Sequence, residues 1–182
     1  MRELEHTIDH ILLTEQQIQD RVRVLAEQIS KDYEGKQLLL VGILKGSMPF
    51  MADLMRYLTI NAKIDFMSVS SYGDGTVSSG QVRIILDLNK PIENYDLLIV
   101  EDILDSGATL AYIKEWLSIR KPRSFKIATL LDKPARRKAD ITADYSCFEI
   151  PDAFVVGYGL DYAEDYRNLP YIGILKPEVY EK

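Results

Sequence analysis

The sequence predicts an α/β fold in which helices flank a central, mainly parallel sheet. Residues 38–44 and 97–100 are short, continuous apolar runs, with the length and composition of strands that are covered on both faces. Segments with apolar residues at helical spacing alternate with such runs along the chain. This alternation is typical of a sheet built with right-handed crossovers.

The first predicted helix covers residues 14–29. Thr14 and Gln17 match a capping box at its start, and Gly35 marks its exit. The apolar residues that follow the cap recur at helical spacing: Ile18, Val22, Leu25 and Ile29.

Two more helices follow predicted strands. One begins at about Met48, where Pro49 suits a first helical turn. The other carries Leu110, Ile113 and Leu117 on one face. The remaining strands are predicted at residues 64–72, 82–88, 125–133, 154–158 and 171–175.

No linker, repeat or low-complexity tract divides the 182 residues, so we expect one domain over 1–182. Residues 73–80 are rich in Gly and Ser and predict a mobile loop.

Composition excludes several functional classes. The net charge of −6 argues against nucleic acid as the main partner, since phosphate backbones require clustered Lys and Arg. No apolar run approaches the roughly 18–20 residues that cross a bilayer, and the charged start lacks the apolar core of a signal peptide. We therefore expect a cytoplasmic protein without a membrane partner. One cysteine and two histidines are too few for a zinc site, and Cys147 is expected to be a packed thiol.

Residues 97–110 carry the chemistry. Glu101 and Asp102 directly follow an apolar strand, at the end where open α/β sheets bind ligands. A short turn then leads into a helix, where free N–H groups and the hydroxyls of Ser106 and Thr109 can surround a phosphate. Any one of these residues could simply cap a helix, but the ordered set favours a site for a ribose-5-phosphate.

This segment, IVEDILDSGATL at residues 99–110, resembles the phosphoribosyl pyrophosphate signature of the type I phosphoribosyltransferases. The flanking segments resemble the hypoxanthine-guanine branch, and the resemblance extends over residues 11–174. It implies the type I phosphoribosyltransferase fold, with a core of about residues 35–150. A small hood would be formed by the N-terminal segment and residues 151–182.

The resemblance also implies an activity. The family transfers the 5-phosphoribosyl group from phosphoribosyl pyrophosphate to N9 of a 6-oxopurine, hypoxanthine or guanine, with Mg²⁺. The products are IMP or GMP and pyrophosphate, in purine salvage. Family members are usually dimers or tetramers, and the segment from Met48 to Met55 is a candidate interface. Alternatively, Phe50, Leu54 and Met55 face the sheet.

Site residues follow from the same resemblance. Glu101 and Asp102 would hold the ribose hydroxyls, directly or through magnesium. Asp105 is the candidate for accepting the N7 proton of the purine, which burial would favour by raising its pKa. The 5′-phosphate loop comprises Asp105, Ser106, Gly107, Ala108 and Thr109.

Pyrophosphate would be bound by three separate segments. The LKGS sequence at residues 44–47 would present Lys45 and the N–H groups of Gly46 and Ser47, and in the family the peptide before the lysine can be cis. Arg167 would supply a bidentate cation. The SSYGDG segment resembles a lid, in which two residues close over the pyrophosphate: Ser71 and Tyr72.

The downstream motifs would select the base. Lys133 would donate a hydrogen bond to the 6-oxygen of the base. A 6-amino group, as in adenine, could not accept that hydrogen bond. Phe154 would stack on the purine, and the backbone of Val155 would reach its pyrimidine edge. Asp161 would contact magnesium or the base.

Three alternatives remain open from the sequence. A nucleotide-sensing, RNA-binding regulator could use the same fold, but it would need a basic face. A phosphoribosyltransferase that prefers xanthine could use the same lysine. A non-catalytic homologue with a role in assembly would have no need of Lys45, Asp105 and Arg167.

Overall fold

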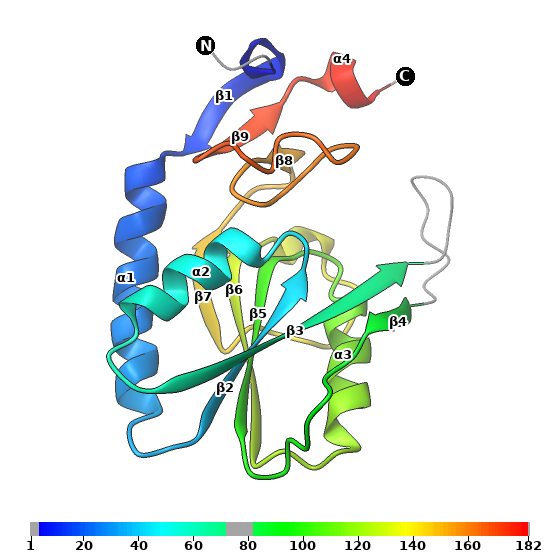
Figure 1. The fold of residues 1–182 in the computed structure, drawn as a ribbon. Coiled ribbons are helices and arrows are strands. Elements are labelled where there is room, and N and C mark those ends of the chain that lie inside the picture. Colours follow the sequence, from blue (N-terminus) through cyan, green and yellow to red (C-terminus); the bar gives the residue numbers. More distant parts are fainter. Residues whose placement is uncertain (1–3, 72–81, 182) are drawn as a thin grey trace.

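Strands and helices alternate along most of the chain, as Figure 1 shows for a computed structural model that describes residues 4–71 and 82–181. The strands are β1 (Ile8–Leu13), β2 (Leu38–Leu44), β3 (Ala62–Ser71), β4 (Val82–Leu86), β5 (Asp96–Leu104), β6 (Ser124–Asp132), β7 (Tyr145–Glu149), β8 (Val155–Val156) and β9 (Ile172–Leu175). The α-helices are α1 (Glu15–Asp32), α2 (Met48–Tyr57), α3 (Ala108–Ser118) and α4 (Pro177–Tyr180), and the short 3₁₀ helices are η1 (Glu5–Thr7) and η2 (Pro134–Arg136).

The larger sheet has six strands in the order β4-β3-β2-β5-β6-β7. All neighbours in it are parallel except β3 and β4, which are antiparallel. The predicted mainly parallel sheet is therefore confirmed. Because β5 lies inside this sheet, its carboxyl end opens between the ends of β2 and β6.

Side chains of the central strands alternate between two cores. Leu98 and Val100 of β5 pack in a cluster with α1 and α2, whereas Leu97 and Ile99 pack in a second cluster with α3. Helices thus cover both faces, which is why the strands are apolar throughout.

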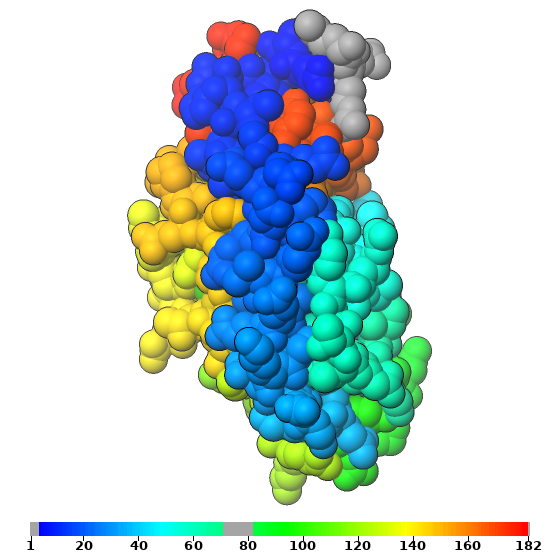
Figure 2. Space-filling view, turned by 90° about the vertical axis from the view of Figure 1, so that its left-hand side faces the viewer, coloured from blue at the N-terminus to red at the C-terminus, as the bar shows by residue number. Residues whose placement is uncertain are grey.

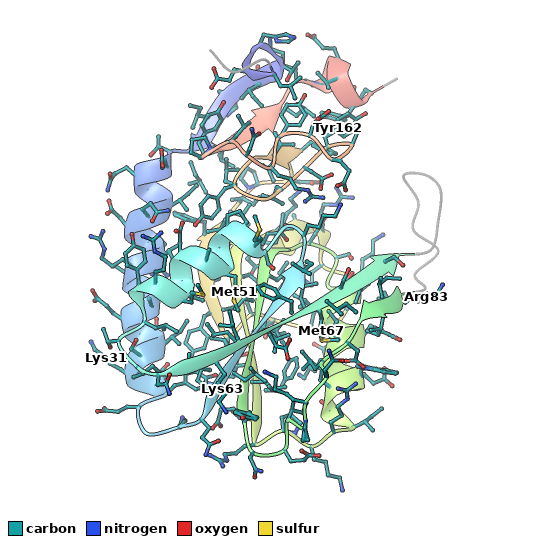
Figure 3. The ribbon with its side chains drawn as sticks, viewed as in Figure 1. Lys31, Met51, Lys63, Met67, Arg83 and Tyr162 are labelled. Carbon is teal, nitrogen blue, oxygen red and sulfur yellow. The ribbon has the colours of Figure 1, made fainter. Side chains whose placement is uncertain are left out.

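The two labelled methionines illustrate this division (Figure 3). Met51 of α2 and Met67 of β3 are almost completely buried and belong to the two different clusters. Lys31 and Lys63 point outward.

The smaller sheet is formed by the two ends of the described chain. Its order is β1-β9-β8, with antiparallel pairing throughout. This sheet is the hood implied by the resemblance. Helix α1 leads from β1 down the side of the core, between α2 and the segment that contains β7 (Figure 2). Arg21 of α1 donates to the carbonyl oxygens of Ser146 and Cys147, both at 3.0 Å.

Some predicted boundaries differ from the structure. Strand β5 continues to Leu104, so Glu101 and Asp102 lie within it. The strand predicted over residues 154–158 contains only Val155–Val156, because Gly157 and Tyr158 have φ values of +100° and +47° and turn the chain. Strand β4 ends at Leu86, two residues before the predicted end.

Other expectations are corrected or lie outside the described residues. Strands β1 and β7 were not predicted. Met55 does not face the sheet, since it is 40% exposed, whereas Phe50 and Leu54 are buried as expected. The predicted loop at 73–80 and Tyr72 lie outside the described residues.

Two expectations from composition can be compared with the structure. Within residues 4–71 and 82–181, no helix is long and apolar enough to cross a membrane. The thiol of Cys147 is free and buried, and burial raises its pKa to about 12. The expected packed thiol is therefore confirmed.

The start of α1 provides a test of local stability. The Thr14 hydroxyl accepts from the Gln17 N–H at 3.3 Å, and the Gln17 side-chain oxygen accepts from the Thr14 N–H at 2.9 Å. We expect Thr14→Ala to lower the free energy of unfolding by about 1 kcal/mol, as measured by urea denaturation. Thr14→Ser keeps the hydroxyl and should lose less; equal losses in both variants would contradict the capping role.

Candidate active site

Two adjacent carboxylates lie near the carboxyl end of β5. The Oε2 atom of Glu101 is buried without a hydrogen-bond partner, and burial, followed by the charge of Asp102, raises the pKa of Glu101 well above its usual value. Burial also raises the pKa of Asp102 to about 6, although its carboxylate accepts from the Ile103 N–H at 2.7 Å. Two acidic side chains whose ionised forms are disfavoured by burial thus lie side by side at this strand end.

The turn after β5 is shaped around Gly107. This residue has a φ of +83°, and a Cβ there would lie 2.6 Å from Cγ2 of Ile141. Neither the conformation nor the space suits a side chain. The Ser106 hydroxyl accepts from the Ala108 N–H at 3.4 Å, and α3 begins at Ala108. Together with Glu101, the turn lines a cavity of about 200 Å³, with Ile103, Leu104, Asp105, Ser106, Thr109 and Leu110.

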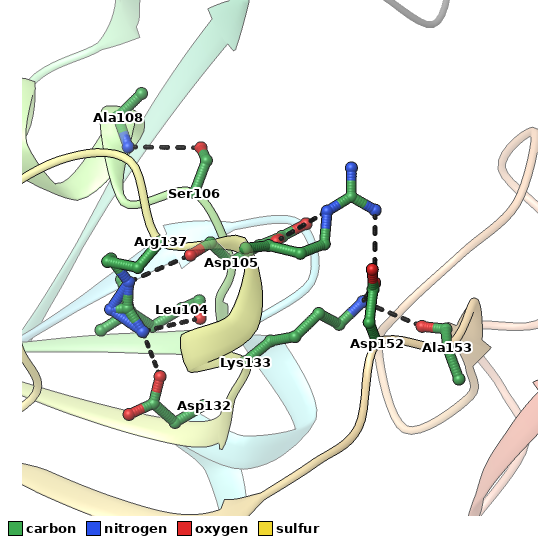
Figure 4. Close-up of polar contacts among 10 residues, drawn as sticks. Leu104, Asp105, Ser106, Ala108, Asp132, Lys133, Arg137, Asp152 and Ala153 are labelled. Atoms are coloured by element: carbon green, nitrogen blue, oxygen red, sulfur yellow. Dashed lines mark hydrogen bonds and ion pairs between the residues drawn. The ribbon is translucent and has the colours of Figure 1, made fainter.

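Arg137 supports this turn from behind (Figure 4). Its guanidinium donates to the carbonyl oxygens of Asp105 at 3.1 Å and Leu104 at 3.3 Å, and pairs with Asp132. The Ser106 carbonyl also accepts from the N–H groups of residues 138 and 139, at 2.9 and 3.0 Å. The segment after β6 therefore fixes the backbone of the turn.

The turn between β2 and α2 lies beside the same strand end. The Leu44–Lys45 peptide bond is cis, a conformation that the sequence alone left undecided. Ser47 is buried; its hydroxyl donates to the Ile43 carbonyl at 2.6 Å, and its N–H donates to the same oxygen at 3.4 Å. Of the two N–H groups expected to face a ligand, that of Ser47 is thus already paired.

Gly46 is in close contact on two sides. A Cβ on Gly46 would lie 1.7 Å from Oδ2 of Asp102, and a Cβ on Gly159 would lie 2.0 Å from the Gly46 carbonyl oxygen. The β2–α2 turn, the end of β5 and the hood segment that contains Gly159 therefore meet with no room for a side chain. Arg167 adds a hydrogen bond of 2.7 Å to the Gly159 carbonyl.

Arg167 and Lys45 lie close to acidic side chains of the hood. Arg167 is 2.8 Å from Asp161 and 3.1 Å from Glu164, and Lys45 is 2.6 Å from the other oxygen of Glu164. The charge of Arg167 also lowers the pKa of Asp102, which opposes the effect of burial. These cations and the carboxylates of β5 thus belong to one electrostatic site.

A second cavity, of about 300 Å³, lies between the core and the hood. Its lining residues are Ile103, Asp105, Lys133, Arg136, Asp152, Ala153, Phe154, Val155, Leu160, Asp161 and Tyr180. Lys133 is only 4% exposed, and burial lowers the pKa of its ammonium group. Its Nζ donates to the Ala153 carbonyl at 2.8 Å and lies 3.9 Å from Asp152, which fixes a cation at the cavity wall (Figure 4).

Phe154 provides an aromatic wall of this cavity. Its ring stacks on Tyr180 with centroids 4.7 Å apart and meets the edge of Tyr162 at 5.6 Å. Aromatic pairs of this kind hold a ring in a defined orientation. Tyr162 is labelled in Figure 3, near α4.

Comparison with known proteins decides the family. A sequence profile described as "Phosphoribosyl transferase domain" matches residues 10–163. The hypoxanthine-guanine phosphoribosyltransferase of Bacillus subtilis is 56% identical over 178 residues, which cover 98% of this chain and 99% of the relative. The enzyme of the same name from Streptococcus mutans is 52% identical over 179 residues, with the same coverage.

The chain belongs to the hypoxanthine-guanine phosphoribosyltransferase family. A crystal structure of a hypoxanthine phosphoribosyltransferase from Staphylococcus aureus superimposes on it with a TM-score of 0.95 and 57% sequence identity. The superposition covers 100% of this chain and 98% of that one.

The structure brings most of the predicted site residues together. Glu101, Asp105, Ser106, Gly107 and Thr109 line one cavity, whereas Asp102 and Ala108 do not. The other cavity is lined by Lys133, Phe154, Val155 and Asp161. Ser71 ends β3, and Tyr72 lies outside the described residues. Asp105 is less enclosed than expected, since its side chain is 39% exposed.

Sequence reasoning missed several residues around the two cavities and beside Lys45, among them Ile103, Arg136, Asp152, Glu164 and Tyr180. Arg136 lies 3.4 Å from Asp105 and 3.7 Å from Asp152. Ile103, the residue after Asp102, could have been included from its position in the signature. Tyr180 carried no local signal, because only the return of the chain through β9 brings it to Phe154.

The buried charge of Glu101 yields a stability prediction. At neutral pH the ionised carboxylate is disfavoured in the folded state, because its pKa is raised there. We expect Glu101→Gln to raise the free energy of unfolding of the ligand-free protein by about 1 kcal/mol and its melting temperature by about 2–4 °C. Glu27→Gln, at an exposed position of α1, makes the same change in net charge and should have little effect. An unchanged or lower melting temperature for Glu101→Gln would contradict the prediction.

Proposed function

We propose that this chain transfers the 5-phosphoribosyl group of phosphoribosyl pyrophosphate to N9 of hypoxanthine or guanine. The observation that carries this proposal is the junction of two cavities, since both are lined by Ile103 and Asp105. One cavity is lined by Glu101 of β5, by the turn that follows and by Thr109 at the start of α3, which suit a ribose phosphate. The other contains a buried ammonium group and an aromatic ring, which suit a 6-oxopurine. A reaction that joins these two ligands needs such a junction.

The β5 turn would bind the 5′-phosphate and the ribose. Backbone N–H groups at the start of α3, with the hydroxyls of Ser106 and Thr109, are suitable donors to a phosphate. Glu101 and Asp102 are suitable acceptors for the ribose 2′- and 3′-hydroxyls. Their desolvation is offset when those hydroxyls or a cation reach them.

The purine would lie in the second cavity. The Lys133 ammonium can donate three hydrogen bonds. Within residues 4–71 and 82–181 it donates one, to the Ala153 carbonyl, so donors are left for the 6-oxygen of the base. An ammonium cannot accept from a 6-amino group, so adenine would be rejected. Phe154 would stack on the ring, and the Val155 backbone would contact its edge.

Asp105 would accept the N7 proton of the base. The Oδ1 atom of Asp105 is buried without a hydrogen-bond partner, and Arg136 lies 3.4 Å from it. A carboxylate that borders both cavities can reach a bound base and accept its proton.

Pyrophosphate would be bound by Lys45, the Gly46 backbone and Arg167, with Ser71 and Tyr72 closing over it. Displacement at C1′ passes through an oxocarbenium-like state, and N9 attacks from the face opposite the leaving group. The protein contributes orientation, complementary charge and exclusion of water. No covalent nucleophile is required.

Magnesium fits the donor set of this site. Mg²⁺ prefers oxygen ligands and is usually bound by one or two carboxylates together with substrate phosphates. No cluster of three or more His, Cys, Asp or Glu that could hold a metal ion is found in residues 4–71 and 82–181. Glu101, Asp102 and Asp161 would therefore bind the metal only together with the substrate. When bound, Mg²⁺ neutralises charge on the pyrophosphate.

This function implies a cytoplasmic protein with small-molecule partners. The enzyme names of its relatives, together with the base cavity, favour the transferase over an RNA-binding regulator. The dimer or tetramer expected from the resemblance stays a prediction, and Met48 and Met55, at 57% and 40% exposed, are available for such an interface.

Turnover of individual bases tests the function. With magnesium and phosphoribosyl pyrophosphate, we expect the protein to form nucleotides from hypoxanthine and guanine but not from adenine. Xanthine is included to rank a third 6-oxopurine. Asp105→Asn removes the proposed proton acceptor and should lower kcat by about 10²–10⁴-fold. No turnover of any base, with nucleotide binding intact, would overturn the transferase proposal.

Lys133 provides a test of base selection. Lys133→Met removes a charged hydrogen-bond donor, which is worth about 1.5–3 kcal/mol, so kcat/KM for hypoxanthine should fall by about 10–100-fold while adenine is still used poorly. Lys138→Met removes an exposed lysine of the next segment and should leave kcat/KM nearly unchanged. Equal values for both variants would show that Lys133 does not contact the 6-oxygen.

A further inference from the structure

The carboxylate of Glu164 bridges the two cations that are proposed to bind pyrophosphate. Its Oε2 atom is 2.6 Å from the Lys45 ammonium, and its Oε1 atom is 3.1 Å from the Arg167 guanidinium. Lys45 comes from the β2–α2 turn and Arg167 from the hood. One anionic group of the chain thus spans the distance between two cations, as a bound phosphate would.

The surroundings of Glu164 stabilise its ionised form. Hydrogen bonds from Lys45 and then from Arg167 lower the pKa of its carboxyl group. The backbone N–H of Glu164 donates to Asp161 Oδ2 at 2.9 Å, and Asp161 in turn pairs with Arg167. The residue also has a φ of +70°, next to Ala163 at +52°. The backbone of this tight turn therefore directs the carboxylate toward the cations.

We propose that Glu164 is an internal anion that occupies Lys45 and Arg167 until pyrophosphate or phosphoribosyl pyrophosphate displaces it. This inference rests on the proposed function, because it assumes that the two cations bind the diphosphate group. The side chains of Lys45 and Glu164 are 67% and 65% exposed, and ion pairs this exposed are weak. Glu164 can therefore give way to a ligand that carries more charge, while Asp161 remains beside Arg167.

The proposed role of Glu164 predicts the direction in which the affinity for pyrophosphate changes when its charge is removed. An internal anion competes with the ligand, so it weakens the binding of pyrophosphate and favours the release of this product, a step that limits turnover in many enzymes. A carboxylate that merely oriented Lys45 and Arg167 would have the opposite effect, because its removal would weaken ligand binding. The direction of the change in affinity therefore separates the two roles.

Glu164→Gln provides the test, since it keeps the size of the side chain and removes its charge. We expect titration calorimetry with inorganic pyrophosphate and magnesium to give a dissociation constant about three- to tenfold lower for Glu164→Gln than for the unaltered protein. This range corresponds to the loss of two exposed ion pairs. The KM for phosphoribosyl pyrophosphate should fall in the same direction.

Asp165→Asn is the matched control. It removes the same charge from the next residue, whose exposed side chain forms no ion pair or hydrogen bond within the described part of the chain. We expect Asp165→Asn to change the affinity for pyrophosphate less than Glu164→Gln does. The change in Asp165→Asn measures the general influence of charge near the site.

Three outcomes would overturn the inference. Weaker binding by Glu164→Gln would assign the residue an orienting role. Equal changes in Glu164→Gln and Asp165→Asn would show that direct pairing does not matter. An absence of pyrophosphate binding by the unaltered protein would contradict the proposed diphosphate site itself. If the unaltered protein binds pyrophosphate but Glu164→Gln does not bind it more tightly, only the role of Glu164 is refuted.

Discussion

The site depends on a close contact at Gly46. Asp102 of the core lies against one side of this residue, and Gly159 of the hood lies against its carbonyl oxygen. Any side chain at Gly46 or Gly159 would separate the segments that are proposed to bind ribose, pyrophosphate and base. Because Gly46 lies against the Asp102 carboxylate and against Gly159, these contacts position the β2–α2 turn, the end of β5 and the hood relative to one another. Such positioning is what a displacement between two bound molecules requires.

The same strand end holds two acidic groups whose ionised forms are disfavoured by burial. A chain optimised only for folding would not place Glu101 and Asp102 side by side with raised pKa values and an unpaired buried oxygen. Buried polar groups without partners are expected to mark functional sites rather than packing. The surrounding strands, which are almost completely buried and apolar, offset this local cost.

Local signals in the sequence predicted most of the fold. The capping box at Thr14 and the apolar run at residues 38–44 define their elements without reference to the rest of the chain, and both were confirmed. Strand β1 was missed because its partner β9 lies at the other end of the chain and none of its own residues is buried. The β5 turn could be predicted because the residues proposed to bind the ligand are contiguous there. Glu164 and Tyr180 could not, since their roles depend on contacts made only after the hood has folded.

The charge distribution explains how an acidic chain can bind polyanions. The net charge is −6, yet the cations of the site are placed individually, and each lies near a carboxylate: Lys45 near Glu164, Lys133 near Asp152, Arg136 near Asp105 and Arg167 near Asp161. In the proposed site, a phosphorylated ligand would therefore exchange one set of ion pairs for another. Affinity then depends on geometry, because only a ligand whose anionic groups match these positions can replace several pairs at once. This arrangement disfavours the nonspecific binding of nucleic acid that a basic surface would bring.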